Sequence, residues 1–362
     1  MASNSFGEIL RITTFGESHN TAMGGVLDGV PSGLLISIFE IQKEVNRRRP
    51  GQSEFTTSRS ELDKVEILSG LHPDINDQGY QLSLGSPIGF VIQNKDKKSS
   101  DYNSLSDVYR PSHADFTYEA KYGVRDHRGG GRASARETIC RVVAGAIAKQ
   151  ILGNDIIIQA YVERMAGIGI PADAQFDISK TKNSNVCCPH EITSKAMEEK
   201  LRSLSSEGDT AGGVISCRIK GVPAGWGEPV FDKLNARLAY AILGINATKG
   251  IEFGSGFAGS ENKGSEENDS FKTLEKTHSN NSGGIQGGIS NGQDVFFRTA
   301  FKPVSSIKSK QKTINKAGLP IEIKIEGRHD PVVLPRAVPI IEAMAYLVLA
   351  DFYLTQRVQL NS

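Results

Sequence analysis

Residues 125–152 read RDHRGGGRASARETICRVVAGAIAKQIL, an arginine- and glycine-rich loop that runs directly into an apolar segment. Ser134 followed by Glu137 matches the Ser-x-x-Glu pattern of a capping box, which predicts that a helix begins here. The apolar residues of the next turns fall on one helical face: Ile139, Val142, Val143, Ala146 and Ile147. The stretch therefore predicts a core helix over Ser134–Leu152 with a glycine loop at its N-terminus.

The loop before this helix is suited to an anion. Gly129, Gly130 and Gly131 let the backbone approach a ligand closely, and the free N–H groups and positive dipole end of a helix N-terminus attract negative charge. Four arginines crowd the same positive end, which is unfavourable unless an anion lies between them: Arg125, Arg128, Arg132 and Arg136. The pattern favours a site for a phosphorylated or multiply acidic ligand, and a flexible, solvated basic loop is the alternative.

Outward from this helix, the chain mixes strand and helix patterns without strict alternation. Strands are predicted at 34–38, 65–68, 88–92, 155–162, 214–219 and 295–301, with a half-buried strand over 321–325. Helices are predicted at 40–48, 192–204, 232–245 and 336–354, the last apolar nearly all round. The polar stretches 94–107 and 260–282 are predicted as surface loops. Since no linker divides the chain, we expect an α+β fold in a single domain over 1–362.

Composition narrows the class of protein. The chain has 42 Lys and Arg against 41 Asp and Glu, a net charge of +1, and a single Trp, which together argue against a nucleic-acid partner. Four cysteines show no C-x-x-C pair and no metal-ligand spacing, so we expect reduced thiols and no metal site. The N-terminus shows no secretory signal pattern and no apolar run has membrane-spanning length, which predicts a soluble, cytoplasmic protein without a membrane partner.

Three further segments carry candidate side chains. Arg48 belongs to an Arg-Arg-Arg-Pro-Gly run that either binds an anion or only complements a helix C-terminus. Arg110 and His113 lie three residues apart in a turn, where a histidine can move a proton or face a leaving phosphate, although a lone loop histidine is more often a surface residue. Asp351 lies towards the C-terminus of the last predicted helix, where the negative end of the helix dipole is unfavourable for a carboxylate. It is therefore either functional or part of a frayed, exposed last turn.

Two apparent motifs lack the context that their chemistry requires. The run from Gly16 to Asn20 departs from the nucleophile elbow at its fifth position, and no strand–turn–helix pattern frames it. The run from Gly254 to Gly259 spells G-x-G-x-x-G but leads into a polar loop instead of a helix. The sequence therefore predicts neither a serine hydrolase nor a dinucleotide-binding fold.

Taken together, these segments resemble the chorismate synthase family. The matching stretches occur in the family's order along the chain: 16–19, 48–51, 110–115, 128–138, 246–247, 283–289, 302–306 and 328–351. The resemblance implies a homotetramer whose fold is a β-α-β sandwich, a helical layer between antiparallel sheets. It implies a carbon–oxygen lyase that converts 5-enolpyruvylshikimate-3-phosphate to chorismate by anti-1,4-elimination of phosphate, the last step of the shikimate pathway towards aromatic amino acids. Reduced FMN would be required without net redox change, and an external reductant would supply it.

The resemblance also implies roles for single residues. His19 would protonate or stabilise the reduced flavin, His113 would assist the departing phosphate, and Asp351 would help the flavin take up the substrate hydrogen. The positions that match the family's FMN contacts are Arg132, Ala133, Ser134, Asn246, Ala247, Gly287, Lys302, Pro303, Val304, Ser305, Ser306 and Arg328. Arg48, Arg110 and Arg136 would bind anionic groups of the substrate. Among the FMN positions, Lys302 and the two serine hydroxyls suit the flavin phosphate.

Three positions depart from the family pattern. Asn20 stands where the family usually has Gly, which bears on the turn behind His19. Glu54 stands where an Arg often contacts substrate or nucleotide, and Val332 where a Cys is common.

Three rival functions remain at this level. A bifunctional family member would also reduce its own flavin with NADPH, but no usable nucleotide motif is visible. A non-catalytic flavin- or anion-binding protein could keep the scaffold, although both histidines and Asp351 are present. An RNA-binding protein would bind with a steep salt dependence and would need more basic charge and more aromatic residues than the chain has.

Overall fold

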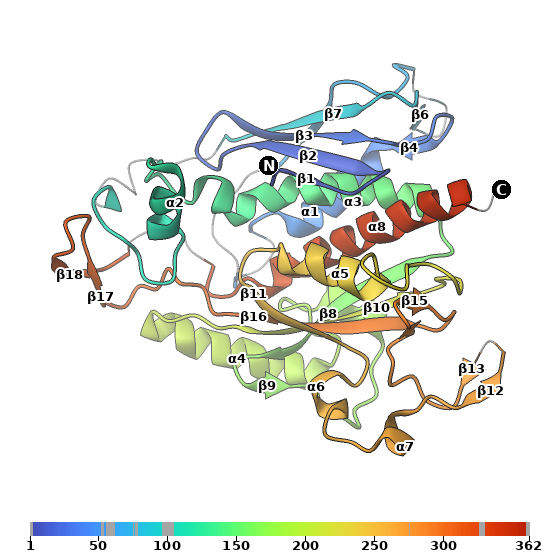
Figure 1. Cartoon of the computed structure of the whole chain (residues 1–362). Coiled ribbons are helices and arrows are strands. Elements are labelled where there is room, and N and C mark those ends of the chain that lie inside the picture. The colour runs from blue at the N-terminus through green and yellow to red at the C-terminus, as the bar shows by residue number, and fades with distance from the viewer. Residues whose placement is uncertain are drawn as a thin grey trace.

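Two five-stranded antiparallel sheets enclose a layer of helices (Figure 1). A computed structural model describes residues 3–51, 54–55, 62–74, 76, 79–95, 105–274, 276–325 and 330–359. The strand order is β1-β2-β3-β7-β5 in the first sheet and β11-β16-β10-β8-β9 in the second. The predicted α+β sandwich, with a helical layer between antiparallel sheets, is confirmed.

The first sheet is built by the N-terminal third of the chain and the second by the middle. The strands of the first sheet are β1 (Ser5–Phe6), β2 (Arg11–Gly16), β3 (Ala22–Asp28), β5 (Val65–Ile67) and β7 (Ile88–Gln93). Those of the second are β8 (Ile157–Met165), β9 (Ile168–Gly169), β10 (Gly213–Lys220), β11 (Thr248–Phe253) and β16 (Val295–Phe301). In β16 every second residue is buried, as expected for a sheet that covers a core with one face.

In the described part of the chain, four two-stranded ribbons lie outside the two main sheets. They pair β4 (Leu35–Ser37) with β6 (Tyr80–Leu82), β12 (Phe271–Thr273) with β13 (Lys276–Thr277), β14 (Ile285–Gln286) with β15 (Ile289–Ser290), and β17 (Gln311–Ile314) with β18 (Pro320–Ile323). The last ribbon projects beside α2 at the end of the molecule opposite the C-terminus (Figure 1).

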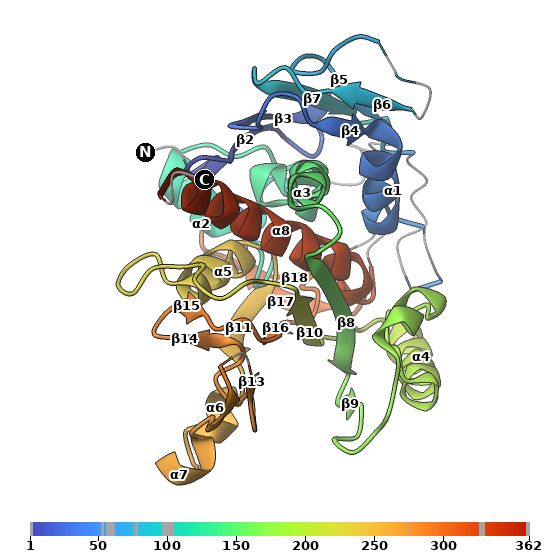
Figure 2. The ribbon, with the colours of Figure 1, turned by 90° about the vertical axis from the view of Figure 1, so that its right-hand side faces the viewer.

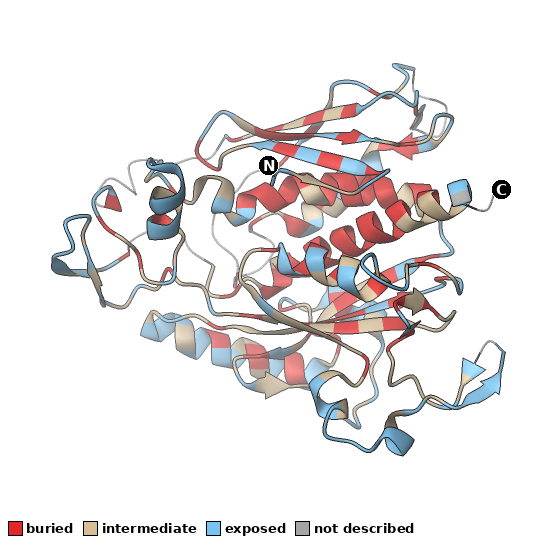
Figure 3. Cartoon of the chain, in the orientation of Figure 1, coloured by how far each residue is buried: buried red, intermediate tan, exposed pale blue. Residues whose placement is uncertain are grey.

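The helical layer contains α1 (Ile38–Arg48), α3 (Thr138–Leu152), α5 (Leu234–Leu243) and α8 (Leu334–Gln359) (Figure 2). The remaining helices are α2 (Asp115–Tyr122), α4 (Glu191–Glu207), α6 (Gly256–Gly259) and α7 (Gly264–Glu267), with 3-10 turns at Gly131–Ala133, Ala135–Glu137 and Ile178–Asn183. The buried residues concentrate on α3, α8 and the inner faces of both sheets (Figure 3). α3 and α8 lie so close that a Cβ added at Gly145 would be 2.5 Å from the Cα of Ala343.

Helix α8 is the structural centre of this layer. It is the single described helix whose length and apolar composition would allow a membrane crossing, but 89% of that apolar segment is buried inside the protein. Such burial is typical of the core helix of a globular protein, as its all-round apolar pattern predicted.

The predicted helices and strands agree in place with observed elements, but other observed elements were not predicted. In the two main sheets these are β1, β2, β3, β9 and β11, and among the helices α2 and α6. His19 lies between β2 and β3, and His113 lies just before α2. The predicted loop over 260–282 contains α7 and the β12–β13 ribbon. Within the predicted loop 94–107, residues 96–104 lie outside the described part of the chain.

Candidate functional site

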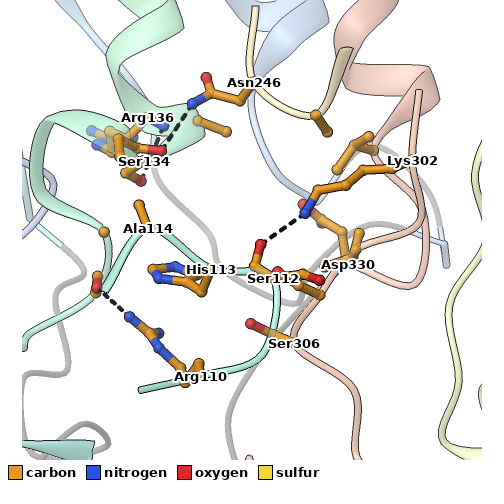
Figure 4. A pocket seen from close by; sticks show the side chains of 18 of the residues that line it. Arg110, Ser112, His113, Ala114, Ser134, Arg136, Asn246, Lys302, Ser306 and Asp330 are labelled. Carbon is orange, nitrogen blue, oxygen red and sulfur yellow. Dashed lines mark hydrogen bonds between the residues drawn. The ribbon is translucent and has the colours of Figure 1, made fainter. Parts of the chain in front are cut away.

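A cavity of about 470 Å³ lies between the start of α2, the glycine loop before α3 and the start of α8. Its size falls within the range of small-molecule sites. It brings together most of the residues that the sequence predicted for catalysis, cofactor and substrate: His19, Arg110, His113, Ala133, Ser134, Arg136, Asn246, Ala247, Lys302, Pro303, Val304, Ser305 and Ser306. Figure 4 shows labelled side chains of this set, among them His113, Ser134 and Lys302, converging from segments far apart in the sequence.

The glycine loop forms one wall in close contact with His19. Gly129 has φ of 75°, and a Cβ added there would lie 2.4 Å from the His19 imidazole, so only glycine fits. Ser134 caps the 3-10 turn that follows by accepting a hydrogen bond from the Arg136 N–H at 3.3 Å. The predicted capping box is not formed, because the Glu137 carboxylate accepts hydrogen bonds from Thr14 and Arg141 instead.

Both lining arginines of the predicted substrate set are held by buried carboxylates. Arg136 donates to Asp63 at 2.8 Å and to Asn94 at 2.7 Å. Arg110 donates from two nitrogens to Asp115, at 2.7 Å each, and reaches the Gly129 carbonyl at 2.9 Å. A guanidinium fixed in this way keeps its charge and orientation at the cavity wall, which suits binding of an anionic group.

The two histidines lie at different depths. The side chain of His113 is 21% exposed, and its Nδ1 lies 2.9 Å from Oδ1 of Asp115. His113 lies centrally among the labelled side chains (Figure 4). His19 is 5% exposed and its Nδ1 lies 3.1 Å from the Ser18 hydroxyl. The cavity therefore has one accessible and one buried imidazole, which can take different proton-transfer roles.

A polar wall opposite the glycine loop is formed by Lys302 and the two serines that follow it. The Lys302 ammonium donates to the Ser112 carbonyl at 2.8 Å (Figure 4), and partial burial together with nearby Lys249 lowers the pKa of Lys302. The hydroxyls of Ser305 and Ser306 lie on the same wall. An ammonium beside two hydroxyls is a donor set suited to a phosphate.

Asn246 joins this wall to the turn before α3. Its Nδ2 donates to the Ala133 carbonyl at 2.8 Å, whereas its Oδ1 is buried and accepts no hydrogen bond from the described residues. A buried acceptor without a donor is costly unless a ligand supplies one. The unsatisfied oxygen therefore indicates where a ligand N–H or O–H would bind.

Asp330 and Arg336 also line the cavity, although the sequence reasoning assigned them no role. They form an ion pair at 2.6 Å, and Arg336 donates to the Arg48 carbonyl at 3.3 Å. The signal that could have found them is the Arg-His-Asp-Pro run shortly before α8, which brings charged residues next to the start of an apolar helix.

Arg48 and Arg132 of the predicted set do not line the cavity. Arg48 is 1% exposed and donates to Thr138 and the Ala135 carbonyl, behind the cavity wall. Burial, followed by the neighbouring Arg336, lowers the pKa of Arg48 to about 9. Arg132 instead turns towards strand β2 and donates to the Thr14 hydroxyl at 2.7 Å. Both arginines support the wall from outside it.

Asp351 and Gly287 also lie away from the cavity. The Asp351 carboxylate accepts the N–H groups of Glu8, Ile9 and Leu10 at 2.8–2.9 Å, which ties the N-terminal segment to α8. Gly287 lies in the turn between β14 and β15 with φ of 60°. Arg328, the remaining predicted contact, lies outside the described residues.

Strained backbone is present in the cavity wall. Ser112 and Ala247 adopt φ of 55° and 69°, a region that side chains other than glycine rarely occupy. Such conformations persist where the surrounding structure holds them and are common at ligand sites. Both residues line the cavity, next to Arg110 and Asn246 respectively.

The three departures from the family pattern are accommodated. The Asn20 backbone is outside the positive-φ region, so no glycine is required there, and its side chain donates to Glu17 at 2.8 Å. Glu54 pairs with Arg202 at 2.6 Å on the surface, and Val332 is fully buried. Among the described residues, no group of three His, Cys, Asp or Glu side chains could hold a metal ion.

Comparisons with known proteins agree on one family. A family model described as chorismate synthase matches residues 10–354. The chain is 52% identical to the chorismate synthase of Christiangramia forsetii over 99% of both chains, and 52% identical to that of Bacteroides fragilis over 98% of both. A crystal structure of chorismate synthase superposes with a TM-score of 0.75 at 29% identity, covering 97% of this chain and 93% of that one. The chain therefore belongs to the chorismate synthase family.

Proposed function

We propose that the chain catalyses anti-1,4-elimination of phosphate from 5-enolpyruvylshikimate-3-phosphate to give chorismate, with reduced FMN bound in the same cavity. The observation that carries this proposal is the gathering of fixed cations, two histidines and a phosphate-type donor set around a single cavity. The membership of the family supports it, since the relatives named above are chorismate synthases along nearly their whole length.

The charge of the cavity suits a substrate with one phosphate and two carboxylates. Arg110, Arg136, Lys302 and Arg336 line it against one carboxylate, that of Asp330. Because the whole chain carries a net charge of only +1, this excess is local to the cavity. We propose Arg110 and Arg136 as substrate-binding residues, with Arg48 acting from behind Arg136 to hold the wall in place.

The residues present also fit FMN. The unsatisfied Oδ1 of Asn246 can accept from a flavin ring N–H, while Lys302, Ser305 and Ser306 can hold a phosphate. The apolar surface for a flat ring comes from Ala133, Ala247, Pro303 and Val304, with Ser134 beside them. Arg132, Gly287 and Arg328 remain proposed contacts on the family pattern alone. When bound, reduced FMN would supply electron density to the substrate as phosphate leaves and would take up the hydrogen.

The chain's own residues would then manage protons and water. His113 is the accessible imidazole, and in its protonated form Nε2, the nitrogen not turned to Asp115, can give a proton to the departing phosphate. The ring is then left neutral with its remaining proton on Nδ1. His19, being buried against the glycine loop, can hold a proton near the flavin without exchange with bulk water. The fixed guanidiniums stabilise the negative charge that develops on phosphate, since they need not reorient during the reaction.

We propose Asp330, in place of Asp351, as the carboxylate of the reaction. Asp330 lines the cavity and is paired with Arg336, whereas both oxygens of Asp351 are occupied by backbone N–H groups elsewhere. We further propose that an external reductant supplies reduced FMN, and that the protein acts as a homotetramer in the cytoplasm without nucleic acid. A membrane partner and a metal ion are not part of this proposal.

Turnover of substitution variants tests the proposal. With reduced FMN and substrate supplied anaerobically, His19→Ala and His113→Ala should each lower kcat by at least ~10²-fold, the lower end for acid–base groups. His72→Ala, on an exposed loop, is the matched control and should keep the wild-type rate. Full activity in both cavity variants would contradict the proposed proton-transfer roles, and binding of FMN and substrate without turnover in the wild type would favour the non-catalytic alternative.

A further inference from the structure

Asp115 is a buried carboxylate at the first position of α2, directly behind the His113 side chain. It is 4% exposed and does not line the cavity described above, although it borders a second hollow of about 350 Å³ beside α2. Its position is set by sequence spacing, because His113 and Asp115 lie two residues apart in the turn that starts the helix. Towards a ligand in the cavity described above, the carboxylate can therefore act only through its neighbours.

Four groups converge on this carboxylate. Arg110 donates its backbone N–H at 3.0 Å and its side chain at 2.7 Å, and the guanidinium of Arg125 lies 2.8 Å away. The fourth is Nδ1 of His113, at 2.9 Å from Oδ1. Burial by itself would raise the pKa of Asp115, but the hydrogen bonds from Arg110 and His113 hold it well below its usual range. Asp115 is therefore ionised, and an ionised carboxylate only accepts hydrogen bonds.

An acceptor at Nδ1 determines which nitrogen of a neutral imidazole carries the proton. A neutral histidine has one N–H and one lone pair, and the partner of one nitrogen decides the state of the other. If Nδ1 carries the proton towards Asp115, then Nε2 presents its lone pair and accepts or returns a proton there. Nε2 makes no hydrogen bond with the described residues, while the ring lines the cavity.

We propose that Asp115 is a positioning residue that holds His113 in the Nδ1–H tautomer, so that Nε2 alone exchanges a proton with the ligand in the cavity. The same carboxylate orients Arg110, so one buried group sets the place of both an anion-binding cation and a proton carrier. The tautomer of His113 follows from the geometry at Nδ1, whereas the proton exchange between Nε2 and the ligand rests on the proposed function.

The wild-type protein tests the tautomer directly. Protein labelled with nitrogen-15 in histidine, studied by long-range nitrogen–proton NMR correlation where the ring is neutral, distinguishes the two tautomers. The His113 signals are those that disappear in His113→Gln. We expect the proton on Nδ1, and a neutral His113 with its proton on Nε2 would overturn the proposal.

Asp115→Asn tests whether the carboxylate is the cause. An amide can present either its oxygen or its NH₂ group to Nδ1, so it no longer selects one tautomer. We expect a mixed or reversed tautomer population and a fall in kcat of at least ~10-fold, as when a group that orients a catalytic histidine is lost. KM should rise by a smaller factor, because Arg110 loses a charged partner but keeps its hydrogen bond to the Gly129 carbonyl. Unchanged tautomer and kcat in a folded variant would refute the role.

Glu119→Gln is the matched control on the same helix. Glu119 approaches Arg125 at 3.3 Å and Lys316 at 3.0 Å but makes no contact with His113, so its variant should keep both the tautomer and kcat. If Asp115→Asn does not fold, the wild-type spectrum still decides the tautomer. A wild-type protein with the Nδ1–H tautomer but no chorismate production would refute the proposed function and still support the positioning role.

Discussion

Two carboxylates that are both near α8 in the sequence have different surroundings in the structure. Asp330 faces the cavity, and Asp351 accepts three backbone N–H groups of the N-terminal segment and lies 3.7 Å from Arg237. Chain position alone could not separate them, because the difference depends on where residues 8–10 fold back onto α8. Their different surroundings support the proposal that Asp330, and not Asp351, is the carboxylate of the reaction.

Asp330→Asn and Asp351→Asn should therefore fail in different ways. Asp330→Asn should lower kcat by at least ~10²-fold, and the loss of its ion pair with Arg336 should also lower the free energy of unfolding. Asp351→Asn should lower the free energy of unfolding by about 1.5–3 kcal/mol, the range for hydrogen bonds to a charged group, and retain most activity. Urea denaturation and steady-state turnover on both variants measure this. The reverse pattern would return the catalytic role to Asp351.

Gly129 is a second residue whose surroundings the sequence did not specify. The glycine run predicted a close approach of the backbone to a ligand, and in the structure the group nearest to Gly129 is the His19 ring. That partner lies 110 residues away in the sequence and could not be read from local spacing. The same limit explains why Asp115 was missed, since its three partners become visible only once the turn is folded.

Gly129→Ala should displace His19 and lower kcat by at least ~10-fold, because the new Cβ would lie 2.4 Å from the imidazole. Gly131→Ala is the matched control. It also has positive φ, 53°, but no atom lies within 4 Å of its added Cβ. Both variants should lose similar stability from backbone strain, as measured by thermal unfolding. Equal activity in the two variants would show that contact with His19 has no functional effect.

At the scale of elements, apolar periodicity predicted the helical layer well and the first sheet poorly. α3 and α8 carry their own apolar patterns, so their existence follows from the sequence. β2 buries Thr14, which donates to Glu137 at 3.0 Å, and β3 contains Gly24 and Gly25. Strands with buried polar or glycine positions lack the regular alternation of apolar and polar residues by which a strand is predicted. The hydrogen-bond partner of Thr14 also comes from a distant segment of the chain.

The crossing of α3 and α8 depends on a small residue. Gly145→Ala would bring its new Cβ to 2.5 Å from the Cα of Ala343, a backbone atom that cannot move aside. We expect the free energy of unfolding to fall by about 1–3 kcal/mol, as for overpacked cores. Gly264→Ala, in exposed α7 with no atom within 4 Å, is the control and should be neutral or slightly stabilising in the same denaturation experiment. A neutral Gly145→Ala would mean that the helices can separate without loss.

At the scale of the whole molecule, charge is distributed unevenly. Residues 302–325, here called the lysine arm, contain six lysines and one glutamate in a chain of net charge +1. The arm starts in the cavity wall at Lys302 and then pairs with the segment that leads to Arg110, through the Asn315–Val108 bridge. The β17–β18 ribbon of the arm lies beside α2 (Figure 1). We also propose that the chain is a single domain, because one buried cluster joins both sheets.

This distribution predicts faster, salt-dependent capture of an anionic substrate. Local fields of one sign raise association rates by about 10–10³-fold at low salt. The test replaces three exposed lysines of the arm by glutamine: Lys308, Lys312 and Lys324. The triple variant should have a kcat/KM at least ~3-fold lower at low salt, an unchanged kcat, and a weaker dependence of kcat/KM on salt. The control replaces three exposed lysines elsewhere: Lys200, Lys220 and Lys272. Equal effects of the two triple variants would contradict a role for the arm.

The central claim, elimination without net redox change in this cavity, is tested most directly by stoichiometry. Purified protein with reduced FMN at a small fraction of the substrate concentration is mixed anaerobically with 5-enolpyruvylshikimate-3-phosphate, and chorismate absorbance, phosphate release and flavin absorbance are followed together. The account predicts one phosphate per chorismate over many turnovers, with the flavin still reduced at the end. Phosphate release without chorismate, or one flavin oxidised per product, would contradict it.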